Sequence, residues 1–503
     1  MLKFIVLLAL LVLPLEIIAQ KIPLSENVNS RYDELAPVLS PDGKTLYLCR
    51  EGHPQNTGFD KRRDDQDIWV SRRTENGDWT KAERLDAKFN SPLYDFPIGV
   101  SGDGSILYIG NKYADDGVVS PGVSRSRLIR EKWGKPEGLR IIDYYNNAGL
   151  VNYYMAPDER TLLLNLKRDD TYGKMDLYIS LQEEDGSWSA PLNLGNTINS
   201  GYNEVTPFIA SDLKTLYFAS DRPGGMGGFD MYFAQRLDDS WRNWSEPVNM
   251  GDTINSQGND ISYIIDPSGE YAIFSSDTKD NGKDLFRVPL PKKFRPETAL
   301  LVSGTIKDLA GKPLSARIYY ERLRDGVKAG QTESNVDTGE FKFTLPKGEK
   351  YGLHAELDGY LSISKTIDNT KNTGSTSMNV DLTMSPISQG TKINLNNIFF
   401  SLGSHTLTKE SHAELKRLAK ILQKNPKMKV EVGGHTDSQG AEKSNRLLSQ
   451  RRAESVRKFL IEQGASAGQI SAKGYGASTP VASNSTAAGR QANRRVEFTI
   501  LDL

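Results

Sequence analysis

Residues 41–49 read PDGKTLYLC, a turn sequence followed at once by an apolar run. Asp and Gly favour tight turns, because the Asp side chain bonds to nearby backbone and Gly tolerates positive φ. The run TLYLC is typical of a buried strand. Four other stretches have the same form: 102–110 (GDGSILYIG), 157–165 (PDERTLLLN), 211–219 (SDLKTLYFA) and 267–275 (PSGEYAIFS). The sequence therefore predicts a turn-and-strand unit that occurs five times.

Two further markers accompany these units. A pair of Asn with Ser or Asn precedes each turn, at residues 29–30, 90–91, 146–147, 199–200 and 255–256, so the repeat length is 53–61 residues. Four units also carry a tryptophan after the second strand, at Trp79, Trp133, Trp188 and Trp244. Short strands repeated at this spacing predict a β-propeller with four-stranded blades. Five blades are expected over residues 20–290, with six as the alternative.

The fifth unit ends at Leu290 without a last strand, whereas residues 23–30 (PLSENVNS) resemble the end of a unit such as 191–200 (PLNLGNTINS). The N-terminal segment is therefore expected to supply the missing outer strand, which would hide the exposed sheet edges. The segments PDGKTLYL and SDRPGGMGGFDMY resemble the PD40 family of WD40-like repeats, found in exported bacterial proteins and TolB-like propellers. That resemblance implies a propeller and a binding platform rather than a reaction.

The N-terminus has the form of an export signal. Lys3 precedes an apolar run from Phe4 to Leu13, and Ala19 is a small residue at a suitable cleavage position. This pattern predicts a signal peptide over residues 1–19, cleaved before Gln20. The mature chain is then expected to be exported, and no cysteine lies directly after the apolar run to support a lipid anchor.

Composition excludes several classes of protein. Cys49 is the one cysteine, so a disulfide framework and a CxxC metal site are excluded. The five histidines are scattered without an HExxH motif, and a net charge of −1 does not favour nucleic acid as a partner. The acidic run Asp64-Asp65-Gln66-Asp67 lacks the loop pattern of a calcium site, which favours a solvated loop. We therefore expect no metal and no cofactor.

Two more domains follow. Residues 291–299 form a proline-containing polar connector, and residues 300–386 contain about seven short alternating strands, which predict a β-sandwich. The turn at 311–314 (GKPL), the strand at 339–341 (GEF) and the ending Gly359-Tyr360 resemble the carboxypeptidase regulatory-like domain. This resemblance implies a non-catalytic spacer or interaction module.

Residues 391–503 alternate strands and helices. Strands are expected over residues 393–400, 428–432 and 495–501, and helices over 408–424 and 442–463. The first helix places Leu415, Leu418, Ala419 and Leu422 on one face. The β-α-β-α-β order predicts an α/β sandwich.

Three motifs mark this last segment: GHTDSQG at 434–440, NRLLSQRRA at 445–453 and NRRVE at 493–497. Together they resemble the OmpA-like peptidoglycan-binding family, which includes the peptidoglycan-associated lipoprotein and the flagellar stator protein MotB. The resemblance implies recognition of the diaminopimelate residue of cell-wall stem peptides. Asp437 matches the family's ammonium-binding Asp, and Arg452 matches its carboxylate-binding Arg. An anionic acceptor and a planar bidentate donor suit a ligand with one ammonium and one carboxylate.

Other residues of the motifs complete the candidate peptidoglycan-binding set: Gly434, His435, Thr436, Asn445, Ser449, Arg494 and Arg495. Arg494 and Arg495 are expected either to add a cation to the site or to pair with Asp437, while Arg451 is the exposed neighbour. The chain departs from the family at Ser401, where an Asp is common, and at Gly403, where an Asn is common. The segment also carries 18 basic and 9 acidic residues, which suits a polyanionic wall.

Together these features predict a non-enzymatic protein of the periplasm, associated with the outer membrane. It would anchor to peptidoglycan by its C-terminal domain and hold an envelope protein on its propeller. The domain order is similar to OmpA-family proteins of the Bacteroidetes type, including the peptidoglycan-anchoring component of the type IX secretion system. The alternative is an exported hydrolase or glycan-active enzyme with its site in the propeller, although the sequence has no GxSxG motif.

Overall fold

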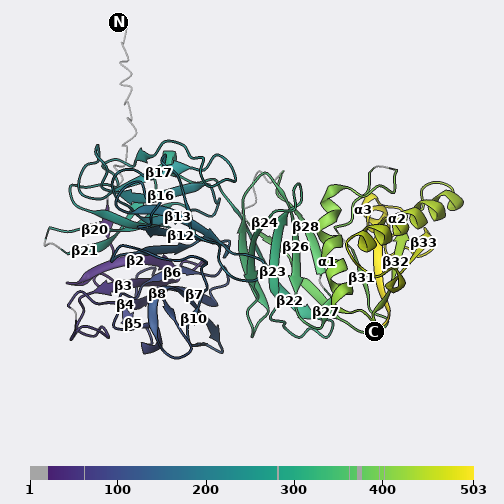
Figure 1. Cartoon of the computed structure of the whole chain (residues 1–503), viewed down its shortest axis with the longest axis horizontal. Coiled ribbons are helices and arrows are strands. Elements are labelled where there is room, and N and C mark those ends of the chain that lie inside the picture. The colour runs from purple at the N-terminus through teal and green to yellow at the C-terminus, as the bar shows by residue number, and fades with distance from the viewer. Residues whose placement is uncertain are drawn as a thin grey trace, which may run out of the picture.

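The computed structural model describes residues 21–61, 63–279, 282–361, 363–370, 377–395, 397–401 and 403–503. The chain forms three bodies along its long axis: an N-terminal set of sheets, a central pair of sheets and a C-terminal α/β body (Figure 1). The predicted signal peptide at 1–19 lies outside the described residues.

The described residues between 21 and 290 form five antiparallel sheets in chain order. The first contains β2 (Asp33–Leu39), β3 (Thr45–Glu51), β4 (Gln66–Arg72) and β5 (Glu83–Arg84). The second contains β6 (Pro97–Val100), β7 (Ile106–Tyr113), β8 (Val119–Ile129), β9 (Lys132–Trp133) and β10 (Glu137–Gly138). The third contains β11 (Asn152–Met155), β12 (Thr161–Leu166), β13 (Asp176–Leu181) and β14 (Leu192–Asn193). The fourth contains β15 (Glu204–Ile209), β16 (Thr215–Ser220), β17 (Asp230–Gln235) and β18 (Val248–Asn249). The fifth contains β19 (Asp260–Ile265), β20 (Tyr271–Asp277), β21 (Lys283–Pro289) and β1 (Ile22–Pro23).

The first strands of these sheets meet in a closed cycle. Each of β2, β6, β11, β15 and β19 contacts the next one, and β19 returns to contact β2. All of them line one small central cavity, with Pro37, Pro97 and Pro207 among the lining residues. Proline has no N–H to offer another strand, so these residues suit a sheet edge that faces an axis.

The repeated Asn-Ser pair links each sheet to the next. The Asn side-chain oxygen accepts the backbone N–H of a third strand in four units: Asn29 from Leu285, Asn90 from Ile68, Asn199 from Leu177 and Asn255 from Met231. The Ser hydroxyl then donates to an acid at or just before the next first strand: Ser30 to Glu34, Ser91 to Asp95, Ser200 to Glu204 and Ser256 to Asp260. The third unit departs, because Asn146 instead accepts the N–H of Lys167. In these four units the Asn-Ser pair therefore joins one sheet to the next by hydrogen bonds.

The N-terminal segment completes the last sheet, as the sequence predicts. Strand β1 pairs antiparallel with β21, with Ile22 opposite Arg287. Lys21 adds an ion pair of 2.6 Å to the buried Asp260, and Val28 is fully buried in the same core as β20 and β21. The outer strand of the fifth sheet therefore comes from the opposite end of this part of the chain.

Deleting residues 20–28 is expected to lower the melting temperature of the protein by several degrees, because it removes β1, the Asp260 ion pair and buried Val28. Calorimetry of the whole chain measures this. The control is Ile22→Ala, since Ile22 is 57% exposed and should change little. An unchanged melting curve after the deletion would show that β1 does not stabilise the closed cycle of N-terminal sheets.

The central body consists of two sheets in the described residues. One contains β22 (Leu300–Asp308), β25 (Glu340–Leu345), β27 (Tyr360–Leu361), β29 (Ser377–Asn379) and β30 (Leu382–Pro386). The other contains β23 (Arg317–Arg322), β24 (Lys328–Glu333), β26 (Lys350–Glu356) and β28 (Ile363–Asp368). Both sheets contribute to one core, which includes Phe341, Phe343 and Tyr320. Within the expected connector, the 3-10 turn Lys292–Phe294 buries Phe294 in the core of the N-terminal part.

Polar contacts join the central body to one end of the N-terminal sheets. Glu333 forms ion pairs with Arg127 and, at 3.5 Å, with Arg125. Arg322 lies 2.7 Å from Asp239. Arg125 and Arg127 lie in the last part of β8, a third strand, and Asp239 lies in the turn between a third and a fourth strand. These positions lie at the same end of the antiparallel sheets as the turns between first and second strands. The other end, where the Asn-Ser segments lie, therefore faces away from the central body.

Glu159 is buried at this junction between the N-terminal sheets and the central body. Its carboxylate accepts hydrogen bonds from Thr332 at 2.7 Å and Tyr108 at 2.9 Å. Burial raises the pKa of Glu159 to about 8, and the carboxylates of Asp103 and Glu333 also raise it. A carboxyl with a raised pKa contributes stability below its unfolded pKa and loses it as pH rises through the folded value.

The melting temperature is therefore expected to fall as pH rises from about 6 to 9, and Glu159→Gln should remove part of that fall. Thermal unfolding at a series of pH values measures it. Glu137→Gln, at a carboxylate with an exposed side chain, should keep the wild-type pH dependence. Identical pH profiles for the wild type and Glu159→Gln would contradict the assignment.

The C-terminal body has a four-stranded sheet in the order β31-β34-β32-β33 among its described residues. Its elements are β31 (Lys392–Asn394), α1 (His412–Lys424), β32 (Lys429–His435), α2 (Glu442–Glu462), β33 (Ile470–Gly476), α3 (Ala487–Asn493) and β34 (Val496–Asp502). Helix α2 packs on β32 and β33, and α1 packs on α2 (Figure 1). The strand expected over 393–400 is wrong for the described residues beyond Asn394, where Phe400 instead forms a single bridge with Leu407. The sequence reasoning missed β33 and α3.

Candidate functional site

Helix α2 approaches the sheet closely because glycines face it. A Cβ at Gly434 would lie 2.2 Å from the carbonyl oxygen of Ser449, and one at Gly474 would lie 2.4 Å from the nitrogen of Gln450. The Ser449 hydroxyl accepts the N–H of Gly476 and donates to the carbonyl of Arg446, both at 2.9 Å. Gly434 and Ser449 are therefore packing residues that fix α2 against the end of β32.

The turn after β32 holds Asp437. Asn445, in the first turn of α2, donates its amide to the carbonyl oxygens of Asp437 at 3.3 Å and Gln439 at 3.0 Å. The N–H of Thr436 donates to the carbonyl of Gly476 at 2.9 Å. The carboxylate of Asp437 accepts the N–H of Gln439 at 3.0 Å. These bonds give the Asp437 side chain a fixed position.

Arg494 is the ion-pair partner of Asp437. Nη1 of Arg494, just after α3, lies 2.6 Å from Oδ2 of Asp437. The Asp437 side chain is 10% exposed and that of Arg494 is 38% exposed. Burial raises the pKa of Asp437, but the bonds from Arg494 and Gln439 outweigh it, so the pKa lies below its ordinary value. Asp437 is therefore ionised, and two of its roughly four acceptor positions are in use.

Arg452 lies on α2 with its Nε fixed. It donates through Nε to the carbonyl of Ser404 at 3.0 Å, and its guanidinium lies 4.9 Å from the centre of the Phe400 ring. Burial, followed by the charge of Arg494, lowers the pKa of Arg452, whereas Asp437 raises it. Neither Nη atom of Arg452 bonds to a residue that the structure describes. The bidentate end of this guanidinium is therefore open to a ligand.

Ser404 and Phe400 are contacts that sequence reasoning missed. They come from the segment with the family departures, where Ser401 bonds through its N–H to the carbonyl of Thr406 and Gly403 has φ +65°. Every residue has a backbone carbonyl, so the residue type of Ser404 could not identify it as the hydrogen-bond partner of Arg452. Gly403 adopts a positive φ, which glycine tolerates without steric cost, and this explains a glycine at the position where Asn is common.

His435 and Arg495 form a second cluster around Glu497. Arg495 lies 2.6 Å from Glu497, and Lys392 lies 3.1 Å from it. His435 is 2% exposed; its Nε2 lies 3.2 Å from Glu497, and its Nδ1 lies 2.9 Å from the hydroxyl of Thr479. Burial and the charge of Arg495 lower the pKa of His435. Arg494 thus pairs with Asp437, whereas Arg495 pairs with Glu497 and supports the strand behind the site.

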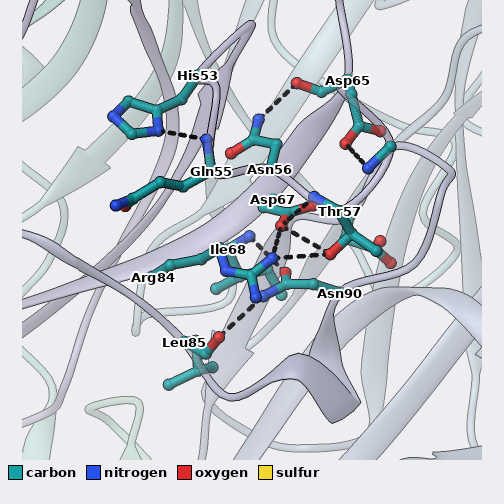
Figure 2. A network of polar contacts seen from close by, with 12 residues as sticks. His53, Gln55, Asn56, Thr57, Asp65, Asp67, Ile68, Arg84, Leu85 and Asn90 are labelled. Carbon is teal, nitrogen blue, oxygen red and sulfur yellow. Dashed lines mark hydrogen bonds and ion pairs between the residues drawn. The ribbon is translucent and has the colours of Figure 1, made fainter. Parts of the chain in front are cut away.

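The acidic run in the first sheet has a structural role. Asp67 accepts hydrogen bonds from the backbone and hydroxyl of Thr57 and from Arg84 at 2.9–3.0 Å (Figure 2). Asp65 accepts the N–H of Gly58 at 2.7 Å. Both acids are fully buried, so the expectation of a solvated loop is wrong for them. No group of three or more His, Cys, Asp or Glu able to hold a metal lies within the described residues.

Comparison with known proteins concerns the C-terminal body. Residues 399–494 match the model of the OmpA family. The C-terminal body is an OmpA family domain. The chain is 45% identical over 108 residues to the probable lipoprotein YiaD of Escherichia coli K12, covering 22% of this chain and 49% of the relative. It is 35% identical over 117 residues to the peptidoglycan-associated lipoprotein of Buchnera aphidicola subsp. Baizongia pistaciae, covering 23% and 65%.

The family model covers 399–494, about a fifth of the chain. The chain spans less than two thirds of the length of both curated relatives. Among solved structures, the peptidoglycan-associated lipoprotein from Burkholderia pseudomallei is 30% identical and covers 20% of this chain and 87% of its own, with a TM-score of 0.20. None of the helices in the described part of the chain is long and apolar enough to cross a membrane.

Proposed function

We propose that this chain is a non-enzymatic cell-envelope protein that anchors to peptidoglycan through its OmpA family domain. The relative from Buchnera aphidicola is named a peptidoglycan-associated lipoprotein, and another relative, from Bordetella avium, is named outer membrane protein A. These names support a location in the periplasm, next to the outer membrane. The predicted signal peptide at 1–19 agrees with export.

The observation that carries the proposal is the open end of Arg452 beside an ionised Asp437. Both Nη atoms of Arg452 remain available, and the carboxylate of Asp437 keeps acceptor capacity beyond Gln439 and Arg494. A diaminopimelate side chain carries one ammonium and one carboxylate. Its ammonium would bind Asp437 and its carboxylate would bind Arg452 in bidentate form.

We also propose that the five N-terminal sheets form a five-bladed propeller that holds an envelope protein. Support comes from the closed cycle of first strands and from β1, which completes the fifth sheet. The central body occupies one end of the sheets, so the partner would bind the opposite end, where the Asn-Ser segments lie. The domain order, similar to that of a type IX secretion anchor, favours a partner in a secretion machine.

Sedimentation with insoluble peptidoglycan tests the anchoring role. We expect the whole wild-type chain to pellet with the wall material and an Asp437→Asn, Arg452→Gln double variant to remain in solution. Arg451→Gln is the matched control, since this neighbour on α2 is exposed. Equal sedimentation of the double variant and the wild type would contradict the proposal.

A further inference from the structure

The site holds more positive charge than a single ammonium and carboxylate require. One carboxylate, Asp437, faces Arg494 at 2.6 Å; Arg490 lies on α3, the helix that Arg494 follows, and Arg452 lies on α2. Although burial raises the pKa of Asp437, both Arg494 and Arg490 lower it, and Arg494 also lowers the pKa of Arg452. Three guanidinium groups therefore interact electrostatically with one carboxylate, and one of them, Arg494, forms an ion pair with it.

The position of Arg490 is fixed by the loop that borders the site. Its Nη1 donates to the carbonyl oxygens of Asn484 at 2.9 Å and Ser485 at 3.3 Å. The side-chain oxygen of Asn484 in turn accepts the N–H of Ser438 at 3.2 Å and the amide of Asn493 at 2.9 Å. Arg490 is thus tied to the residue that follows Asp437 rather than left as a free surface cation.

The protein leaves this excess charge without a partner acid. Within the described residues, neither Arg452 nor Arg490 forms an ion pair, whereas the adjacent Arg495 is paired with Glu497. Like charges held together in a partly buried site disfavour each other, so the empty site favours an incoming anion. One ligand carboxylate on Arg452 would still leave a surplus cation.

We propose that Arg490 and Arg494 bind a second carboxylate of the same stem peptide, so that the domain selects stems in which this group is not amidated. The inference rests on the proposed peptidoglycan function. A stem with diaminopimelate carries further carboxylates, on its D-glutamate and at its C-terminal D-alanine. Arginine suits this role because it stays charged and binds carboxylate through a planar pair of donors.

The test is calorimetric titration of the whole chain with three synthetic tetrapeptides of sequence L-Ala-γ-D-Glu-diaminopimelate-D-Ala. One is unmodified, one has the D-glutamate α-carboxyl amidated, and one has the C-terminal carboxyl amidated. We expect one of the two amidations to weaken wild-type binding by about ten- to a hundredfold, the loss of one charge-assisted contact. The amidation that weakens binding identifies the carboxylate that Arg490 and Arg494 bind.

In the variants Arg490→Gln and Arg494→Gln, the amidated and the unmodified peptide should bind with nearly equal affinity. Arg490→Lys should keep part of the difference in affinity between the two peptides. The ratio between peptides is the readout, because Arg494→Gln also frees Asp437 and changes absolute affinity. Arg451→Gln should keep the wild-type ratio. Equal wild-type affinity for all three peptides, or an unchanged penalty in both Gln variants, overturns this inference alone. Failure of the wild type to bind any of them overturns the proposed function as well.

Discussion

Arg452→Ala is expected to lower the affinity of the protein for a diaminopimelate stem peptide by about ten- to a hundredfold, since a charge-assisted hydrogen bond contributes roughly 1.5–3 kcal/mol. The substitution removes both open Nη atoms at once. The fold should survive, because Arg452 makes one hydrogen bond, to the carbonyl of Ser404, within the described residues. Isothermal calorimetry with the purified stem peptide measures the affinity.

Arg451→Ala is the matched control for this prediction. It lies one residue away on α2, and a helix turns by about 100° per residue, so its side chain points elsewhere. Arg451 is exposed, whereas Arg452 is half-buried against Phe400. Equal losses of affinity in the two alanine variants would show that Arg452 does not bind the ligand carboxylate.

Arg417→Ala is expected to destabilise the protein by about 3–5 kcal/mol, because it leaves buried carboxylates without their partner. Arg417 on α1 lies 2.9 Å and 3.0 Å from the two carboxylate oxygens of Glu321 on β23, and 2.7 Å from Glu414. The side chains are 13%, 10% and 3% exposed, respectively. Urea denaturation of the whole chain measures the change in the free energy of unfolding.

Lys420→Ala provides the comparison on the same helix. Lys420 pairs with Glu184 at 3.5 Å, but both side chains are largely exposed, so the loss should stay below about 1 kcal/mol. The Arg417→Ala defect should also shrink at low pH, because burial raises the pKa of Glu321 and protonation removes the charge that Arg417 balances. A defect for Arg417→Ala as small as that for Lys420→Ala would mean that this ion pair does not join the central and C-terminal bodies.

Much of the N-terminal fold could be predicted because its rules are local. The turn at 41–44 and its counterparts act within a few residues, and the repeat length sets one sheet for each unit. The Asn-Ser pair could be recognised from the sequence as a marker. Its structural role could not, because it depends on contacts between residues that are far apart in the sequence. Asn29 bonds to Leu285, and this contact spans almost the whole N-terminal part.

The C-terminal site was predictable only in its residue types. The motifs indicated Asp437 and Arg452, and they offered pairing of Arg494 and Arg495 with Asp437 as one of two alternatives. That Arg494 forms this pair depends on α3, which the sequence reasoning missed. This helix has seven residues, Ala487–Asn493, too few to show a helical period. Strand β33 was also not predicted, because Gly474 and Gly476 interrupt its apolar pattern. These glycines are required by the close approach of α2, a tertiary constraint.

The most direct test of the proposed function is to titrate the wild type with two stem peptides that differ in one group. One peptide carries diaminopimelate, and the other carries lysine, which keeps the ammonium and lacks the second carboxylate. If Arg452 binds that carboxylate, the lysine peptide should bind the wild type about ten- to a hundredfold more weakly and should bind Arg452→Ala about as well as the diaminopimelate peptide does. Equal binding of both peptides by the wild type would contradict recognition of diaminopimelate by this domain.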